Sequence, residues 1–189
     1  MSTTTVSLVG VGGQGILLAA AVLANAALAE GLDVKASEVK GMAQRGGSVV
    51  STVRFGANVA SPLATHADLV IATELLEGRR ALPMLVQGGT LVCSATRIVP
   101  GGVLRHEEEY PEDLAQAVAA RGLRLVSVDA DGLAAQAGTS RAANVVLLGA
   151  ASTVLSFSPQ SWERALELAL PAKILALNKR AFELGRQAT

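Results

Sequence analysis

Two glycine-rich motifs hold the residues of this 189-residue chain whose types and spacing could do chemistry. The first is Gly10-Val-Gly-Gly-Gln-Gly15, which has the spacing G-x-G-x-x-G. Its glycines permit a tight turn, and the N–H groups that open the following helix can bind a phosphate. The motif lies between a predicted strand and a predicted helix, as a dinucleotide-binding turn requires. The candidate cofactor-binding residues here are Gly12, Gly13, Gln14 and Gly15.

Other interpretations of this first motif stay open. The spacing from Gly10 to Gly15 also fits a P-loop, but Ile16 and Leu17 stand where that loop needs Lys and Ser or Thr. Hydrolysis of a nucleoside triphosphate is therefore not expected. A dinucleotide site also needs an acidic residue at the end of the second strand, but Glu30 and Asp33 fall before the predicted strand and Glu38 falls just after it. A glycine turn that only lets helix and sheet pack closely is the structural alternative.

The second motif, Glu38-Val-Lys-Gly-Met-Ala-Gln-Arg-Gly-Gly-Ser48, is predicted to form a long polar loop. Long loops within a compact domain often have a function. Arg45 lies between glycines at the expected carboxyl end of a parallel sheet, so its guanidinium could donate two hydrogen bonds to a phosphate or carboxylate. A solvated surface loop is the plainer alternative. The candidate binding residues are Gln44, Arg45, Gly46, Gly47 and Ser48.

Short apolar strands alternate with helices along most of the chain and must position both motifs. The predicted strands are Thr4–Val9, Val34–Ser37, Val49–Phe55, Asp68–Ala72, Thr90–Ser94 and Leu123–Val128. The predicted helices are Ile16–Ala29, Glu74–Val86 in two pieces, Pro111–Arg121, Asp131–Ala137, Ala142–Phe157, Pro159–Leu170 and Ala172–Arg186. This alternation predicts an α/β fold, a Rossmann-like three-layer domain with a mostly parallel sheet and a helical C-terminal segment. No repeat or linker divides the chain, so residues 1–189 are expected to form one domain.

The composition argues against several classes of function. Sixteen basic residues balance sixteen acidic ones, which gives no electrostatic reason to expect nucleic acid or a membrane as partner. Cys93 is the single cysteine, so the chain cannot supply a four-thiolate zinc site or an iron–sulfur cluster. His66 and His106 have no partner at metal-ligand spacing. The first basic residue, Lys35, follows the apolar segment instead of preceding it, which argues against a secretory signal and favours a cytoplasmic location.

Five segments, spread in order over nearly the whole chain, are similar to one family. They are 10–15, 40–49, 53–56, 142–149 and 178–185. They resemble the gamma-type domain of the 2-oxoacid:ferredoxin oxidoreductases. The stretch Gly41-Met-Ala-Gln-Arg-Gly-Gly-Ser48 is most similar to the small beta subunit of the indolepyruvate type.

The resemblance implies an activity that belongs to a complex. Enzymes of this family convert a 2-oxoacid, such as pyruvate or an arylpyruvate, and coenzyme A to an acyl-CoA and carbon dioxide, and they reduce ferredoxin. The resemblance implies that an alpha subunit carries thiamine diphosphate, magnesium and the iron–sulfur clusters. It also implies that this chain is inactive alone, has no catalytic residue or metal ligand, and helps to bind coenzyme A through its two glycine motifs. The alternatives are a nicotinamide- or flavin-dependent dehydrogenase and a non-catalytic scaffold subunit.

Three further side chains have two possible roles each. Cys93 ends an apolar strand and is expected to be a small core residue rather than a reactive thiol. Asn144 lies in an apolar helix, where it could contact a ligand or, more simply, make a hydrogen bond to another helix. Trp162 is a candidate aromatic anchor for a partner subunit.

Overall fold

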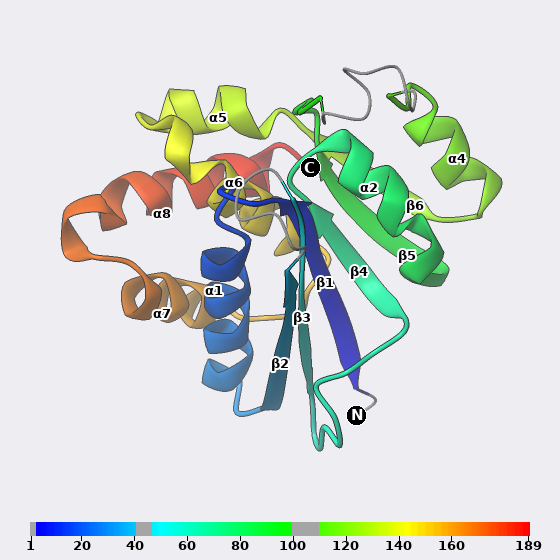
Figure 1. Cartoon of the computed structure of the whole chain (residues 1–189). Helices are drawn as coiled ribbons and strands as arrows, with labels where there is room; N and C mark the ends of the chain where they lie inside the picture. Colours follow the sequence, from blue (N-terminus) through cyan, green and yellow to red (C-terminus); the bar gives the residue numbers. More distant parts are fainter. Residues whose placement is uncertain (1–2, 41–46, 100–109) are drawn as a thin grey trace.

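The computed structural model describes residues 3–40, 47–99 and 110–189, and a six-stranded sheet forms its centre (Figure 1). The strand order is β2-β3-β1-β4-β5-β6. The strands are β1 (Thr4–Val11), β2 (Asp33–Lys40), β3 (Ser48–Gly56), β4 (Ala67–Ala72), β5 (Leu85–Ser94) and β6 (Arg124–Val128). β1, β4, β5 and β6 pair in parallel, whereas β3 runs antiparallel to both β1 and β2. The predicted α/β fold with a mostly parallel sheet is confirmed.

Helices cover both faces of this sheet (Figure 1). One face carries α1 (Ile16–Ala29) and α6 (Ala143–Ala151), and α5 (Ala130–Ala137), α7 (Pro159–Ala169) and α8 (Ala172–Gln187) pack against these two. The other face carries α2 (Leu75–Ala81), which continues into the 3-10 turn Leu82–Met84, and α4 (Leu114–Ala120). Each face has its own apolar cluster, as the predicted three layers require.

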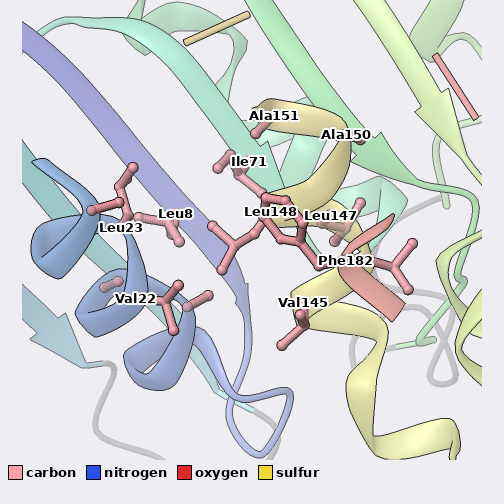
Figure 2. Packing of buried hydrophobic residues seen from close by; sticks show 14 of the residues in the cluster. Leu8, Val22, Leu23, Ile71, Val145, Leu147, Leu148, Ala150, Ala151 and Phe182 are labelled. Carbon is pink, nitrogen blue, oxygen red and sulfur yellow. The ribbon is translucent and has the colours of Figure 1, made fainter. Parts of the chain in front are cut away.

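Alternation along the strands fills both clusters. Leu8 of β1 points to the α1 side and Val9 to the α2 side, because successive side chains of a strand face opposite ways. Figure 2 shows Leu8 and Ile71 from the sheet beside Leu23 of α1 and Leu148 of α6, all of them buried. The core therefore holds the carboxyl ends of the central strands and the start of α1 in fixed relation.

The C-terminal helices approach the core very closely. A Cβ on Gly149 of α6 would lie 1.9 Å from the carbonyl oxygen of Phe182, and a Cβ on Gly185 of α8 would lie 1.9 Å from that of Val146. Only a residue without a side chain allows the two helix backbones this separation. The helical C-terminal segment is thus part of the core and not an appendage.

The phenylalanines and the tryptophan form one row of contacts. The ring centroids of Phe55 and Phe157 are 5.0 Å apart, those of Phe157 and Trp162 are 5.5 Å apart, and those of Trp162 and Phe182 are 5.3 Å apart. This row joins β3 to α7 and α8. Trp162 is only 2% exposed, so the expectation that it anchors a partner subunit is wrong.

Several predicted boundaries differ from the structure. β5 begins at Leu85 and not at Thr90, so the strand includes Gly88 and Gly89. Gly88 has a φ of 73°, and the pairing of β5 with β4 shifts register near it. α4 begins at Leu114 and not at Pro111. α6 ends at Ala151 and not at Phe157.

Both ends of the second glycine motif, which the sequence predicts to be one long loop, belong to strands. Residues 38–40 continue β2, and Ser48 already belongs to β3. The pairing of Lys40 with Val49 brings the ends of β2 and β3 together. Weak alternation around Pro100-Gly-Gly102 in the sequence predicts a hairpin or an excursion from the sheet over 96–107, and most of this range, 100–107, lies outside the described part of the chain.

Candidate functional site

The first glycine motif forms the turn from β1 to α1, as predicted. Gly13 and Gly15 have φ values of 103° and 74°, in the left-handed region that glycine adopts most readily. Gly15 is the N-cap of α1, and no side chain caps this helix. The backbone N–H groups of the first helical turn are therefore left for a ligand or solvent, at the end where the helix dipole favours an anion.

The side chain of Gln14 joins this turn to the end of β4 by hydrogen bonds. Its Oε1 accepts hydrogen bonds from the Val11 N–H at 2.8 Å and from Thr73 Oγ1 at 2.6 Å. Its Nε2 donates to the carbonyl oxygen of Thr73 at 3.1 Å. The side chain of Gln14 is thus used to shape the turn, which adds a structural role to the predicted binding role.

The second motif meets the first at the carboxyl end of β1. Ser48 pairs with Val11 in the antiparallel ladder of β3 and β1. The N–H of Gly12 donates to the carbonyl oxygen of Gly47 at 2.9 Å. Gly47 and Ser48 therefore lie beside the glycine turn, as a joint site requires. The other three candidates of this motif, Gln44, Arg45 and Gly46, lie outside the described residues.

The start of α2 contributes two buried carboxylates that the sequence analysis did not select. Glu77 is 6% exposed at its side chain, and its Oε2 accepts a hydrogen bond from Ser48 Oγ at 2.5 Å. Its Oε1 pairs with the guanidinium of Arg80 at 2.8 Å. Their position in the sequence could have indicated them. Glu74 and Glu77 follow the buried strand β4, and the binding sites of α/β proteins lie at the carboxyl ends of the strands.

Glu74 is fully buried and serves the fold. Its Oε1 accepts from the N–H of Glu77 and caps α2, and its Oε2 accepts from the hydroxyl of Tyr110 at 2.8 Å. Burial, together with the hydrogen bond and the negative charge of Glu74, raises the pKa of Tyr110 well above its usual range. The guanidinium of Arg97 lies 4.6 Å from the centre of the tyrosine ring.

A hollow of about 410 Å³ lies over the glycine turn, on the α1 side. It is lined by Gly13, Gln14, Gly15, Leu18, Thr73, Asp131, Ser140, Arg141, Ala143 and Asn144. Arg141 is exposed, and within the described part of the chain its guanidinium has no carboxylate partner. Helix N–H groups and an exposed guanidinium that line the same hollow suit a phosphate.

Asn144 links this hollow to the core. It is 4% exposed, its Nδ2 donates to the carbonyl oxygen of Gly15 at 3.0 Å, and its Oδ1 accepts from the N–H of Val145 at 3.0 Å. The expected hydrogen bond from Asn144 to another helix is present, and its partner is the N-cap residue of α1, Gly15, which also belongs to the glycine turn.

Cys93 is a core residue, as expected. It is 1% exposed, and burial raises the pKa of its thiol to about 12, with the charge of Glu74 adding to the effect. A thiol that stays protonated at neutral pH is a poor metal ligand or nucleophile. Over residues 3–40, 47–99 and 110–189, no group of three or more His, Cys, Asp or Glu side chains could hold a metal ion. Within the same residues, no helix is long and apolar enough to cross a membrane.

A glycine turn between strand and helix, at the carboxyl edge of a mostly parallel sheet, places the protein among the Rossmann-like α/β domains. The chain belongs to the pyruvate ferredoxin/flavodoxin oxidoreductase family, whose model matches residues 5–188. It is 37% identical over 195 aligned positions to the indolepyruvate oxidoreductase subunit IorB of Thermococcus kodakarensis, covering 100% of this chain and 96% of that protein.

Solved structures have the same fold. The gamma subunit of a keto/oxoacid ferredoxin oxidoreductase from Geobacter sulfurreducens superposes with a TM-score of 0.74 at 23% identity, covering 98% of this chain and 97% of that chain. A 2-oxoglutarate:ferredoxin oxidoreductase from Magnetococcus marinus, determined with 2-oxoglutarate, coenzyme A and succinyl-CoA bound, superposes with a TM-score of 0.78 at 20% identity. This second match covers 100% of this chain and 31% of the other, so the same fold there is part of a longer chain.

Proposed function

We propose that this chain is the beta subunit of an indolepyruvate-type 2-oxoacid:ferredoxin oxidoreductase. The complex converts an arylpyruvate and coenzyme A to an acyl-CoA and carbon dioxide, and it reduces ferredoxin. Identity of 37% over the full chain to an indolepyruvate oxidoreductase subunit supports this assignment. The observation that carries it is the meeting of the two glycine motifs at the uncapped start of α1, where Gly12 is bonded to Gly47.

In this proposal the chain binds part of coenzyme A and does no bond-breaking chemistry. Coenzyme A carries a pyrophosphate and a 3′-phosphate, which are suited to helix N–H groups and to arginine. The first-turn N–H groups of α1, the backbone of Gly13 and Arg141, which lines the same hollow, would bind a phosphate. Arg45 and its neighbours Gln44 and Gly46 would contact coenzyme A from the second motif. Gln14 and Ser48 would hold the two motifs in place.

The redox chemistry belongs to the alpha subunit in this proposal. That partner would carry thiamine diphosphate with magnesium, and iron–sulfur clusters that pass electrons to ferredoxin. The buried, protonated thiol of Cys93 supports this division, because this chain's one cysteine is not placed as a cluster ligand. Residues 1–189 would act as a single domain of a cytoplasmic complex without affinity for nucleic acid or membrane.

Reconstitution tests the assignment. The chain alone should not reduce ferredoxin with indolepyruvate and coenzyme A, whereas the chain produced together with its alpha subunit should do so. Activity of the chain alone would contradict the division of labour. Saturable binding of NAD or FAD to the chain, measured by calorimetry, would support a dehydrogenase instead.

A charge-removing variant tests the coenzyme A site. Arg45→Ala in the complex should raise the KM for coenzyme A about tenfold and leave the KM for indolepyruvate within about twofold, because a phosphate loses a charge-assisted pair. Arg164→Ala removes an equal charge from α7 and serves as the matched control. Equal KM values for coenzyme A in both variants would remove Arg45 from the site.

A further inference from the structure

The contacts around the glycine turn form a closed ring through three segments of the chain. The Gln14 side chain bonds to Thr73, which directly precedes α2. On the first turn of α2, Glu77 accepts the hydrogen bond of Ser48. The neighbour of Ser48 is Gly47, whose carbonyl oxygen accepts from Gly12 and so returns the ring to the turn.

Glu77 is the charged member of this ring and is unusually constrained. Its carboxylate is 6% exposed, and the N-cap bond from its own N–H to Glu74 fixes its backbone. One carboxylate oxygen is taken by Arg80, at 2.8 Å, and the other by Ser48, at 2.5 Å. Hydrogen bonds to a charged acceptor are shorter and stronger than neutral ones, so a buried carboxylate of this kind can hold the serine in one position.

Ser48 is well placed to transmit that constraint. It is exposed, begins β3 and pairs with Val11, so without Glu77 its side chain has no described partner to orient it. A shift of Ser48 also moves Gly47, which is bonded to the turn through Gly12. A carboxylate on α2 can thus control the distance between the two glycine motifs.

We propose that Glu77 is a positioning residue for coenzyme A binding, which sets the second glycine motif against the glycine turn through its hydrogen bond with Ser48. This inference rests on the proposed function, because it takes the joint edge of the two motifs as the coenzyme A site. Glu77 itself does not touch coenzyme A. It acts by holding Ser48, and with it Gly47, beside the glycine turn.

The experiment measures KM and kcat of the complex with its alpha subunit. Glu77→Ala should raise the KM for coenzyme A about fivefold, with kcat at saturating coenzyme A within about twofold. Glu77→Gln retains an oxygen acceptor for Ser48 and should restore the KM to within about twofold of wild type. Ser48→Ala should reproduce the effect of Glu77→Ala, and the double variant should be no worse than either single variant, because both remove one interaction.

A second readout in the same complex does not depend on coenzyme A. Hydrogen exchange followed by mass spectrometry should show faster exchange at the Gly12 N–H in Glu77→Ala, because its bond to Gly47 is loosened. Glu163→Ala on α7 is the matched control: it removes a carboxylate paired with Lys179 at 2.6 Å, and it should change neither exchange at Gly12 nor KM.

The outcomes separate this inference from the proposed function. If Arg45→Ala raises the KM for coenzyme A and Glu77→Ala does not, Glu77 is not a positioning residue. If Arg45→Ala, Ser48→Ala and Glu77→Ala all leave that KM unchanged, the coenzyme A site is wrongly placed and the positioning role for coenzyme A falls with it. Faster exchange at Gly12 in Glu77→Ala would then show only that Glu77 holds the two motifs together. Unchanged exchange at Gly12 in Glu77→Ala would overturn the inference that Glu77 holds the two motifs together.

Discussion

Glycines occur at the β1–α1 turn and at the α6–α8 contact for opposite reasons. A Cβ on Gly13 would meet no atom within 4 Å, whereas a Cβ on Gly149 or Gly185 would lie 1.9 Å from a carbonyl oxygen of the facing helix. The space beside Gly13 is open, whereas the helix contact leaves no room beside Gly149 and Gly185. Glycine in a family segment can therefore mark an open backbone or a packed one, and only the surroundings distinguish the two.

The largest effect is expected at the packed contact. Gly185→Ala should lower the free energy of unfolding by about 3 kcal/mol, because the clash is with the Val146 backbone, which cannot rotate away. For a chain of this size the melting temperature should fall by about 6–12 °C. Thermal unfolding checks this, with Lys173→Ala on the exposed start of α8 as control. A melting temperature within 2 °C of wild type would show that the helices separate easily.

Gly15→Ala should have an intermediate effect. The φ value of 74° costs an L residue about 1–2 kcal/mol, and the new Cβ would lie 2.5 Å from Nδ2 of Asn144. Because Asn144 is a side chain and can move, the variant Asn144→Ala should relieve the clash but not the backbone strain. Urea unfolding of both single variants and the double variant measures the two contributions. Strict additivity would mean that the clash contributes nothing.

Of the three glycine variants, Gly13→Ala should have the smallest effect on stability at neutral pH. It therefore tests the difference between an open glycine and a packed one. Only the strain of φ 103° applies, because the space around it is open, and we expect a loss of about 1 kcal/mol. The KM for coenzyme A in the complex should nevertheless rise, since a methyl group would occupy the ligand side of the turn. A loss of stability as large as that of Gly185→Ala would contradict the distinction between open and packed glycines.

Cys93 should make the stability of the protein depend on pH in the alkaline range, and it should have no such effect at neutral pH. Cys93 lies on the α2 side of the sheet below the turn, and its pKa rises from 9.0 to about 12 on folding. A raised folded-state pKa gives stability that is complete below pH 9 and is lost as pH rises from 9 towards 12. Unfolding measured across this range should be less pH-dependent in Cys93→Ala than in wild type. An equal slope would exclude Cys93 as its source.

Local patterns predicted the elements well where caps and periodicity agree. α7 begins at Pro159, as predicted, because the side chain of Ser158 accepts a hydrogen bond from the N–H of Ser161 and caps the helix. The end of α6 was not predictable from periodicity, since Ser152 and Thr153 turn their hydroxyls back to carbonyls three residues earlier and stop the helix.

The candidate site was predictable in part for a similar reason. The glycine turn is a local motif, so its place between β1 and α1 could be read directly from Gly10 to Gly15. The contact between Gly12 and Gly47 depends on β3 running antiparallel beside β1, which local sequence does not specify. Glu77 was missed because its importance arises only when that pairing brings Ser48 to α2.

Trp162 in the row of aromatic rings is an intrinsic fluorescence probe. Trp162 is the chain's single tryptophan, and it is buried between Phe157 and Phe182 at the joint of α7 and α8. Its fluorescence in the isolated chain should therefore follow the docking of the C-terminal helices and shift to longer wavelength when they detach. The residues that line the hollow over the glycine turn do not include it, so ligand titrations there need another probe.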